Sequence, residues 1–237
     1  MRRILSLITL ALLGAAGLSA TSLLVNGDFE TVDSRLDIPV FGTNPLERPL
    51  DQLTTIGRAA VYGSLPGWSL LTGTGVEVQV NGVLDFVSAH SGGHYIELDS
   101  HSNGSSSSNS AIAQTVNLLA GWYELSFWYF PRMDSSSPAN DNLVAAYLGS
   151  LASTPLLVAN SFRDATTTWT RFQTTFFVGS PGMQTIILAA GGAASGYGGL
   201  VDDVGLQLLE LHTPEPATYT LVGVGLIGLF VALRRRR

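Results

Sequence analysis

The chain of 237 residues contains no cysteine and no lysine, and only 13% of its residues are charged. Without cysteine the protein forms no disulfide bond, no thiolate metal site and no lipid-modified N-terminal cysteine. Without lysine it has no amine nucleophile. The sequence also carries no GxSxG, HExxH or P-loop motif. These absences argue against the common nucleophilic, zinc-dependent and nucleotide-dependent enzymes, and we expect a protein that is not an enzyme.

Positive charge is scarce in the central part of the chain. Residues 21–212 hold 6 of the 12 arginines and 17 of the 18 acidic residues, which gives this part a formal net charge of −11. Such a surface repels the phosphates of nucleic acids, so we exclude DNA and RNA as partners. Calcium, or a neutral ligand such as a sugar, suits this charge better.

The first 20 residues have the three parts of a secretory signal peptide. Two arginines directly after Met1 are followed by an apolar run from Ile4 to Leu18, and small residues, Ser19 and Ala20, stand at the expected cleavage point. We therefore predict an exported protein with a helical signal peptide over residues 1–20. An uncleaved N-terminal anchor is the alternative.

The end of the chain combines an apolar run with four arginines. Ala217 to Leu233 contains no charged residue, and at about 1.5 Å per residue a helix over this run is roughly 25 Å long. Arginine stems extend its reach to that of a bilayer. The sequence predicts a transmembrane helix over residues 217–233, with the domain before it outside the cytoplasm. The expected cytoplasmic cluster is Arg234, Arg235, Arg236 and Arg237.

Pro214, Glu215 and Pro216 stand directly before this apolar run. A Pro-Glu-Pro, a short span and a terminal arginine cluster, in this order, resemble the PEP-CTERM sorting signal of Gram-negative bacteria, also known as the ice-binding protein C-terminal domain. The resemblance covers residues 213–237. It implies that an exosortase-type enzyme of the membrane cuts near the motif and releases the protein to the cell envelope or the extracellular matrix.

Short strand-like segments dominate the central part of the chain. Eight segments rich in alternating, β-branched or aromatic residues lie between turns of Gly, Pro, Ser and Asn. They are residues 23–30, 75–80, 94–98, 111–118, 122–130, 168–178, 184–190 and 200–209. Serine-rich residues 101–110 are expected to form a loop, and residues 33–64 a long insertion. The pattern predicts one all-β domain, an antiparallel β-sandwich, over residues 21–212.

Several short motifs, taken in order, resemble the galactose-binding-like jelly-roll sandwiches, which include carbohydrate-binding modules. They are LLVNGDFE, LPGWSL, SGGHYIELDS, IAQTVNLLAGWYELSFWY, TTTWTRFQTTF and GLVDDVGL. The resemblance spans most of the central domain. It implies a jelly-roll fold of two antiparallel sheets, polysaccharide as a partner, and often a structural calcium ion between the N-terminal segment and the last strand.

Four acidic residues are candidates for such a calcium site. Asp28 and Glu30 flank Phe29, which is expected to face the core, and Asp202 and Asp203 begin the last expected strand. Calcium binds six to eight oxygen atoms in irregular geometry, so carboxylates from both ends of the domain suit it. Solvated surface carboxylates, or carboxylates bonded to loop amides, are the alternative.

A zinc site is not expected at the three clustered histidines, His90, His94 and His101. The residues between the first two, Ser91-Gly92-Gly93, oppose a helix, so the four-residue spacing does not place both rings on one helical face.

Aromatic residues in the segment 122–130 are candidates for stacking on a sugar ring. Strand alternation predicts that one set of side chains faces the core: Tyr123, Leu125, Phe127 and Tyr129. Trp128 and Phe130 fall on the opposite side and are candidates for lining a concave sugar-binding face. Packing in a core is the alternative, because aromatic side chains are common there too.

Together these features predict an exported, non-catalytic envelope or matrix protein that binds polysaccharide. Two alternatives remain open: a structural matrix protein without a discrete ligand, and a small secreted glycoside hydrolase that uses two nearby carboxylates.

Overall fold

The structure is a computed structural model that describes residues 22–31, 39–41, 59–82, 84, 87–101, 107–132, 142–160, 168–212 and 234. The predicted signal peptide, the transmembrane helix over 217–233 and the Pro-Glu-Pro motif lie outside these residues. Within the described ranges, no helix is long and apolar enough to cross a membrane.

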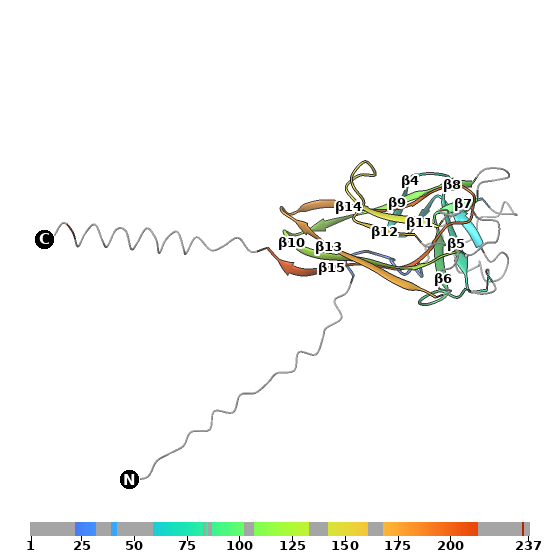
Figure 1. Cartoon of the computed structure of the whole chain (residues 1–237), viewed down its shortest axis with the longest axis horizontal. Helices are drawn as coiled ribbons and strands as arrows, with labels where there is room; N and C mark the ends of the chain where they lie inside the picture. Colours follow the sequence, from blue (N-terminus) through green and yellow to red (C-terminus); the bar gives the residue numbers. More distant parts are fainter. Residues whose placement is uncertain are drawn as a thin grey trace, which may run out of the picture.

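Two antiparallel sheets pack face to face and form a β-sandwich (Figure 1). Sheet A has seven strands in the order β1-β2-β5-β6-β15-β10-β13. They are β1 (Pro39–Phe41), β2 (Ala59–Tyr62), β5 (Val76–Val80), β6 (His94–Glu97), β15 (Leu200–Leu211), β10 (Gly121–Phe130) and β13 (Thr170–Val178). This arrangement confirms the predicted antiparallel sandwich.

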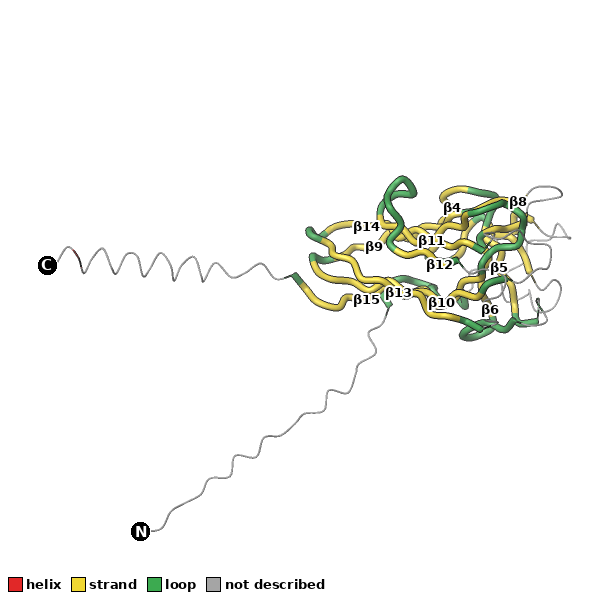
Figure 2. Tube along the Cα trace, viewed as in Figure 1, coloured by secondary structure: helices red, strands yellow, loops and turns green. Residues whose placement is uncertain are grey.

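Sheet B has six strands in the order β12-β11-β14-β9-β4-β3. They are β12 (Leu157–Ala159), β11 (Leu143–Leu148), β14 (Gly182–Gly191), β9 (Ala111–Leu118), β4 (Trp68–Thr72) and β3 (Ser64–Leu65). A separate ribbon pairs β7 (Asp99–His101) with β8 (Ser107–Asn109). The tube in Figure 2 shows the long strands of both sheets running along the sandwich, with turns at its ends.

Seven of the eight expected segments contain strands, and the structure adds several that the sequence pattern did not indicate. The added strands are short or lack alternation: β3 has two residues, and β11 is the continuous apolar run LVAAYL. The serine-rich segment expected to be a loop includes β8, which pairs with β7.

The main core fills the space between the two sheets. The four β10 side chains predicted to face inward, Tyr123, Leu125, Phe127 and Tyr129, are all buried in it. Sheet B contributes Trp68, whose ring lies 6.2 Å from that of Phe29. Burial of large aromatic side chains supplies much of the favourable free energy of folding in a sandwich of this size.

Residues 23–30 do not form a strand, so this prediction is wrong. Asn26 and Phe29 have φ angles of 53° and 56°, which interrupt an extended backbone. The Asn26 side chain holds the resulting turn, because its Oδ1 accepts a hydrogen bond from the Thr31 amide at 2.8 Å and its Nδ2 donates to the Pro66 carbonyl at 3.0 Å. Asparagine tolerates this left-handed backbone better than most residues.

This N-terminal turn ties the two sheets together. The Val204 amide of sheet A donates to the Gly27 carbonyl at 2.8 Å. On the other side, the Gln114 side chain of sheet B accepts from the Val25 amide at 2.7 Å and donates to the Val25 carbonyl at 2.9 Å. Residues 22–31 therefore bridge the sandwich and carry Glu30 to the loop that precedes β6.

Candidate functional site

The outer face of sheet A carries the candidate sugar-binding residues. The connection between β5 and β6 lies over one end of this face, because its Val87 packs in a small second core with Tyr95 of β6, Phe130 of β10 and Leu200 of β15. This core is separate from the main core between the sheets.

Phe130 is only 2% exposed, so the expectation that it lines a sugar-binding face is wrong. The Trp169 ring packs against it edge-on, with the ring centroids 5.6 Å apart. Trp169 is itself fixed to the covering loop, because its Nε1 donates to the Ser88 carbonyl at 2.7 Å. Phe130 therefore serves as a packing residue under the loop, which is the alternative that the sequence left open.

Trp128 is half-buried, and one face of its indole is covered by His90. The two rings stack with centroids 3.7 Å apart and an angle of 16° between their planes. The His90 Nδ1 atom in turn contacts Oδ2 of Asp203 in a short polar contact. The carboxylate thus holds the imidazole over the indole, and access to this face of Trp128 depends on the position of His90.

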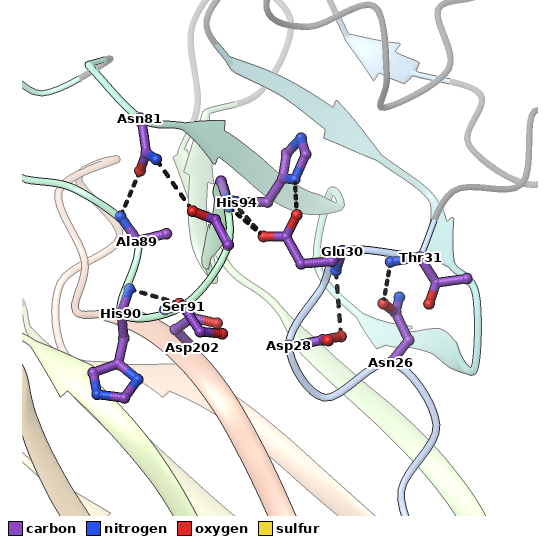
Figure 3. A network of polar contacts seen from close by, with 12 residues as sticks. Asn26, Asp28, Glu30, Thr31, Asn81, Ala89, His90, Ser91, His94 and Asp202 are labelled. Atoms are coloured by element: carbon purple, nitrogen blue, oxygen red, sulfur yellow. Dashed lines mark hydrogen bonds and ion pairs between the residues drawn. The ribbon is translucent and has the colours of Figure 1, made fainter.

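Two acids of β15, Asp202 and Asp203, hold the first half of this loop, and Figure 3 shows Asp202 beside it. Asp202 Oδ2 accepts hydrogen bonds from the amides of His90 at 2.8 Å and Ser91 at 3.1 Å. Asp203 Oδ1 accepts from the Ser91 hydroxyl at 2.7 Å. The φ angle of Asp203, 47°, marks the irregularity in β15 that lets neighbouring acids reach the same loop.

Glu30 holds the second half of the loop from the N-terminal turn (Figure 3). Its Oε1 accepts hydrogen bonds from the amides of Gly93 at 2.7 Å and His94 at 2.6 Å, and its Oε2 lies 2.7 Å from His94 Nδ1. A Cβ atom on Gly92 would come within 2.5 Å of the Glu30 carboxyl, so glycine permits this close approach. The loop is therefore clamped between carboxylates from the two ends of the domain.

Of the four candidate calcium ligands, Glu30, Asp202 and Asp203 thus contact different parts of one loop. Asp28 is exposed, and its Oδ1 is 3.4 Å from the Glu30 amide. Across the described ranges, no group of three or more His, Asp or Glu side chains is arranged to hold a metal ion. In the structure the carboxylates of Glu30, Asp202 and Asp203 are engaged by protein groups, and calcium binding stays a prediction.

The pKa of Asp202 is raised to about 7, chiefly by burial and also by the nearby Asp203 carboxylate, while hydrogen bonds from the amides of Ser91, Asp203 and His90 oppose the rise. Burial disfavours the charged form of a carboxyl group, which is the physical cause of the shift. The acid that anchors the loop therefore changes its charge near neutral pH.

Beyond the loop, the outer face of sheet A carries a row of polar side chains. Arg171 Nη2 of β13 donates to Glu124 Oε1 of β10 at 2.6 Å and to Ser126 Oγ at 3.3 Å. Gln207 Nε2 of β15 donates to the same Glu124 oxygen at 2.9 Å. The exposed Gln173 contacts Arg171. We call Glu124, Ser126, Arg171, Gln173 and Gln207 the polar strip.

The polar strip ends at Trp128, since Arg171 pairs directly with Trp128 across the two strands. Sequence reasoning missed Arg171 and Gln173, although the alternation of TWTRFQTTFF places them on the side opposite Phe172. In the middle of the strip, Gly205 lies beside Ser126 and adds no side chain above the sheet.

A second acidic cluster is buried on the interior strands β5 and β6 of sheet A. Glu97 is 0% exposed and receives hydrogen bonds from Arg132 Nη1 at 2.5 Å and from Gln79 Nε2 at 2.7 Å. Gln79 Nε2 also donates to Glu77 at 3.0 Å. Burial raises the pKa of Glu97 well above its usual range, against the lowering effect of Arg132. The carboxylates of Glu77 and Glu97 cannot reach a substrate, because both are buried.

Comparison with known proteins assigns the C-terminal tail. The profile of the PEP-CTERM protein-sorting motif matches residues 212–237. This match confirms the sorting signal predicted from Pro214, Glu215, Pro216 and the terminal arginines. The signal implies an exported protein that is anchored transiently in the membrane and handed to an exosortase. A search of curated proteins gives no match.

Several solved structures are similar to the domain. One is the carbohydrate-binding module TmCBM61 in complex with β-1,4-galactotriose, with 19% identity, 62% of this chain and 92% of that chain covered, and a TM-score of 0.44. Another is a family 35 carbohydrate-binding module from Clostridium thermocellum, with 19% identity, coverage of 64% and 92%, and a TM-score of 0.36. The Stig cyclase Fisc from Fischerella sp. TAU gives 16% identity, coverage of 82% and 100%, and a TM-score of 0.46.

Proposed function

We propose that the exported domain is a non-catalytic module of the cell envelope or extracellular matrix of a Gram-negative bacterium, and that it binds polysaccharide along the polar strip of sheet A. The observation that carries this proposal is the continuous row of hydrogen-bonding side chains that ends at the half-buried Trp128. A sugar ring needs an aromatic face and several donors and acceptors. The strip supplies the donors and acceptors, and Trp128 supplies an indole, one face of which is covered by His90.

The mutual hydrogen bonds of the strip favour binding because they hold its side chains in place before a ligand arrives. Arg171 and Gln207 both donate to Glu124, so less side-chain entropy is lost on binding. From Glu124 to Trp128 the strand extends about 13 Å at roughly 3.3 Å per residue. That length suits several residues of a sugar chain rather than a single ring.

The charge of the domain favours a neutral polysaccharide. Residues 21–212 carry a formal net charge of −11, which repels acidic polymers at low ionic strength. Within the strip, the charge of Arg171 is balanced by Glu124.

A catalytic role is not supported by the acids that the structure brings together. Glu77 and Glu97 share the Gln79 amide but are buried, and Asp202 and Asp203 are engaged by the loop before β6. A glycoside hydrolase needs two carboxyl groups that flank an accessible bond.

The proposal is tested by electrophoresis of the full chain, in mild detergent, through gels that contain a neutral or an acidic polysaccharide. We expect at least one neutral polymer to retard the protein. The double variant Arg171→Met, Gln173→Ala should lose this retardation relative to a gel without polymer. If no polymer retards the unaltered protein, the binding proposal fails and a structural matrix role takes its place.

A matched control is available on the outer face of sheet B. Thr115 and Thr185 form an exposed pair there, with their hydroxyl oxygens 3.0 Å apart. The double variant Thr115→Ala, Thr185→Ala removes a comparable polar pair from the opposite face and should be retarded like the unaltered protein. Equal loss of retardation in both double variants would contradict a site on sheet A.

A further inference from the structure

One end of the sandwich is apolar although the domain as a whole is strongly acidic. Strand register brings three segments together at this end, because Leu118 pairs with Gly182, and Gly121 pairs with both Val178 and Leu211. We call these segments, residues 118–122, 177–183 and 208–212, the apolar cap. Figure 1 shows β15 ending at this end of the molecule, at the left of the view.

The apolar cap holds six of the ten large hydrophobic side chains that are exposed among the described residues, with exposed fractions from 42% to 66%. They are Leu119, Trp122, Phe177, Met183, Leu209 and Leu211. The rings of Trp122 and Phe177 lie 5.3 Å apart, and the His212 ring meets Phe177 edge-on at the same separation. Large apolar side chains that cluster in this way mark an interaction surface, whereas single exposed ones do not.

Charge is nearly absent from the apolar cap. Of its 17 residues, Glu210 is the one acid, and none is an arginine. The domain outside the cap therefore holds 16 of the 17 acidic residues of residues 21–212. This difference in charge between the cap and the rest of the domain suits a partner that has an apolar interior just beneath a polar surface layer.

The sorting tail begins where the apolar cap ends. His212 is fixed to the cap, since its amide donates to the Ala120 carbonyl at 2.9 Å. Only Thr213 to Pro216 separate it from the uncharged run that starts at Ala217. Four residues span at most about 14 Å, so a tail inserted in a membrane keeps the cap beside the bilayer surface.

We propose that the apolar cap docks on the outer surface of the lipid bilayer while the sorting tail is inserted. Tryptophan, phenylalanine and leucine side chains gain free energy at the boundary between headgroups and acyl chains. The cap suits zwitterionic lipid, because Glu210 and the acidic domain above it repel anionic headgroups. Docking holds the Pro-Glu-Pro motif at the membrane surface, where an enzyme of the membrane reaches it, and it turns the far end of the sandwich away from the membrane.

The absence of cysteine allows a direct test with single spin labels on the full chain in phosphatidylcholine vesicles. Ser180→Cys places a label in the exposed turn of the cap. Thr72→Cys places a control label at the opposite end, because Thr72 pairs with Ala111, about 23 Å along β9 from Leu118 at roughly 3.3 Å per residue. Collision with lipid-soluble oxygen, relative to a water-soluble nickel chelate, reports the surroundings of each label.

We expect the oxygen-to-nickel collision ratio to be several-fold higher at position 180 than at position 72. Adding Leu119→Ser, Trp122→Ser and Phe177→Ser should lower the ratio at position 180 to that of the control. A thermal melt checks that this variant is folded, and Trp122→Ser alone, expected to lower the ratio part of the way, replaces it if it is not.

Two results would overturn the proposal. If the cap substitutions leave the ratio at position 180 unchanged, the tail alone keeps that turn near the membrane and the cap does not dock. If the label at position 180 shows dipolar broadening that disappears on dilution with unlabelled protein, the cap is covered by a second copy of the chain instead of lipid.

Discussion

Asp202 is a buried acid that anchors the loop before β6 through the amides of His90 and Ser91. Its pKa, raised by burial to about 7, lies well above that of an aspartate in the unfolded chain. The folded protein therefore holds a proton at this site that the unfolded chain has already released. It follows that the contribution of Asp202 to stability falls as the pH rises from about 4 to about 7, and then stays constant.

Replacing the acid by its amide should remove this dependence. We predict that the unaltered protein loses stability relative to Asp202→Asn as the pH rises. The difference between their unfolding free energies should change by a few kcal/mol between pH 4 and pH 7.5. Urea denaturation at a series of pH values measures it. Asp203 and His90, which lie nearby, are present in both proteins. A difference that does not vary with pH would contradict an elevated pKa.

Phe130 and Trp128 are neighbours on β10 with different surroundings. Phe130 is enclosed by Val87, Tyr95, Leu200 and Trp169, so we predict that Phe130→Ala lowers the unfolding free energy by about 3–5 kcal/mol. Trp128 is half-buried, and Trp128→Ala should cost less stability while weakening polysaccharide binding. Denaturation curves of both variants test this order. Equal losses of stability would place Trp128 in the core as well.

Strand alternation predicted the residue pattern of β10 but not what covers its outer face. Tyr123 to Tyr129 alternate into the core as expected, because the period of a strand is local. Phe130 is covered by a loop some 40 residues earlier in the chain, and no local period reports such a contact. The buried pair of Glu97 and Arg132 was missed for the same reason.

Among the structural elements, the N-terminal turn connects the two sheets of the sandwich. The sequence LLVNGDFE alternates like a strand, but positive φ angles at Asn26 and Phe29 make it a turn. Such a backbone is set by tertiary contacts, here with Pro66 and Gln114, and alternation cannot reveal it. Long strands such as β13 and β14 were predictable, whereas two-residue and three-residue strands were not, because they pair only where a neighbour is available.

The close contact of this turn with β15 gives a prediction. A Cβ atom on Gly27 would lie 2.0 Å from the Val204 carbonyl oxygen, so Gly27→Ala forces the turn away from the strand. We expect a loss of about 1–3 kcal/mol in unfolding free energy. Gly93 is the matched control, since a Cβ atom there meets nothing within 4 Å. Gly93→Ala should change stability by less than about 0.5 kcal/mol, and similar melts for the two variants would contradict the contact.

For the molecule as a whole, the resemblance to galactose-binding-like sandwiches predicts a structural calcium ion. The candidate ligands Asp28, Glu30, Asp202 and Asp203 lie around one loop, and protein groups already engage three of them. If an ion joins them, chelator should lower the melting temperature of the protein and added calcium should restore it, because the ion binds only the folded form. A melting temperature that is equal in chelator and in calcium would contradict the site.

The molecule combines a sorting tail, an apolar end beside it and a polar strip along sheet A. Tail and fold could be predicted from the sequence, because Pro-Glu-Pro with its apolar run and the strand periods are local patterns. The polar strip could not, since it joins β10, β13 and β15 through side chains up to 83 residues apart.

We have proposed that polysaccharide binds on the polar strip beside Trp128. Hydroxyl-radical footprinting of the protein, with and without a polysaccharide shown to bind it, tests this binding site. We predict that oxidation of Trp128 falls on binding, while Met183, which is 66% exposed on the outer face of sheet B, is oxidised equally in both samples. Unchanged oxidation of Trp128 in a sample where the polysaccharide is bound would contradict the account.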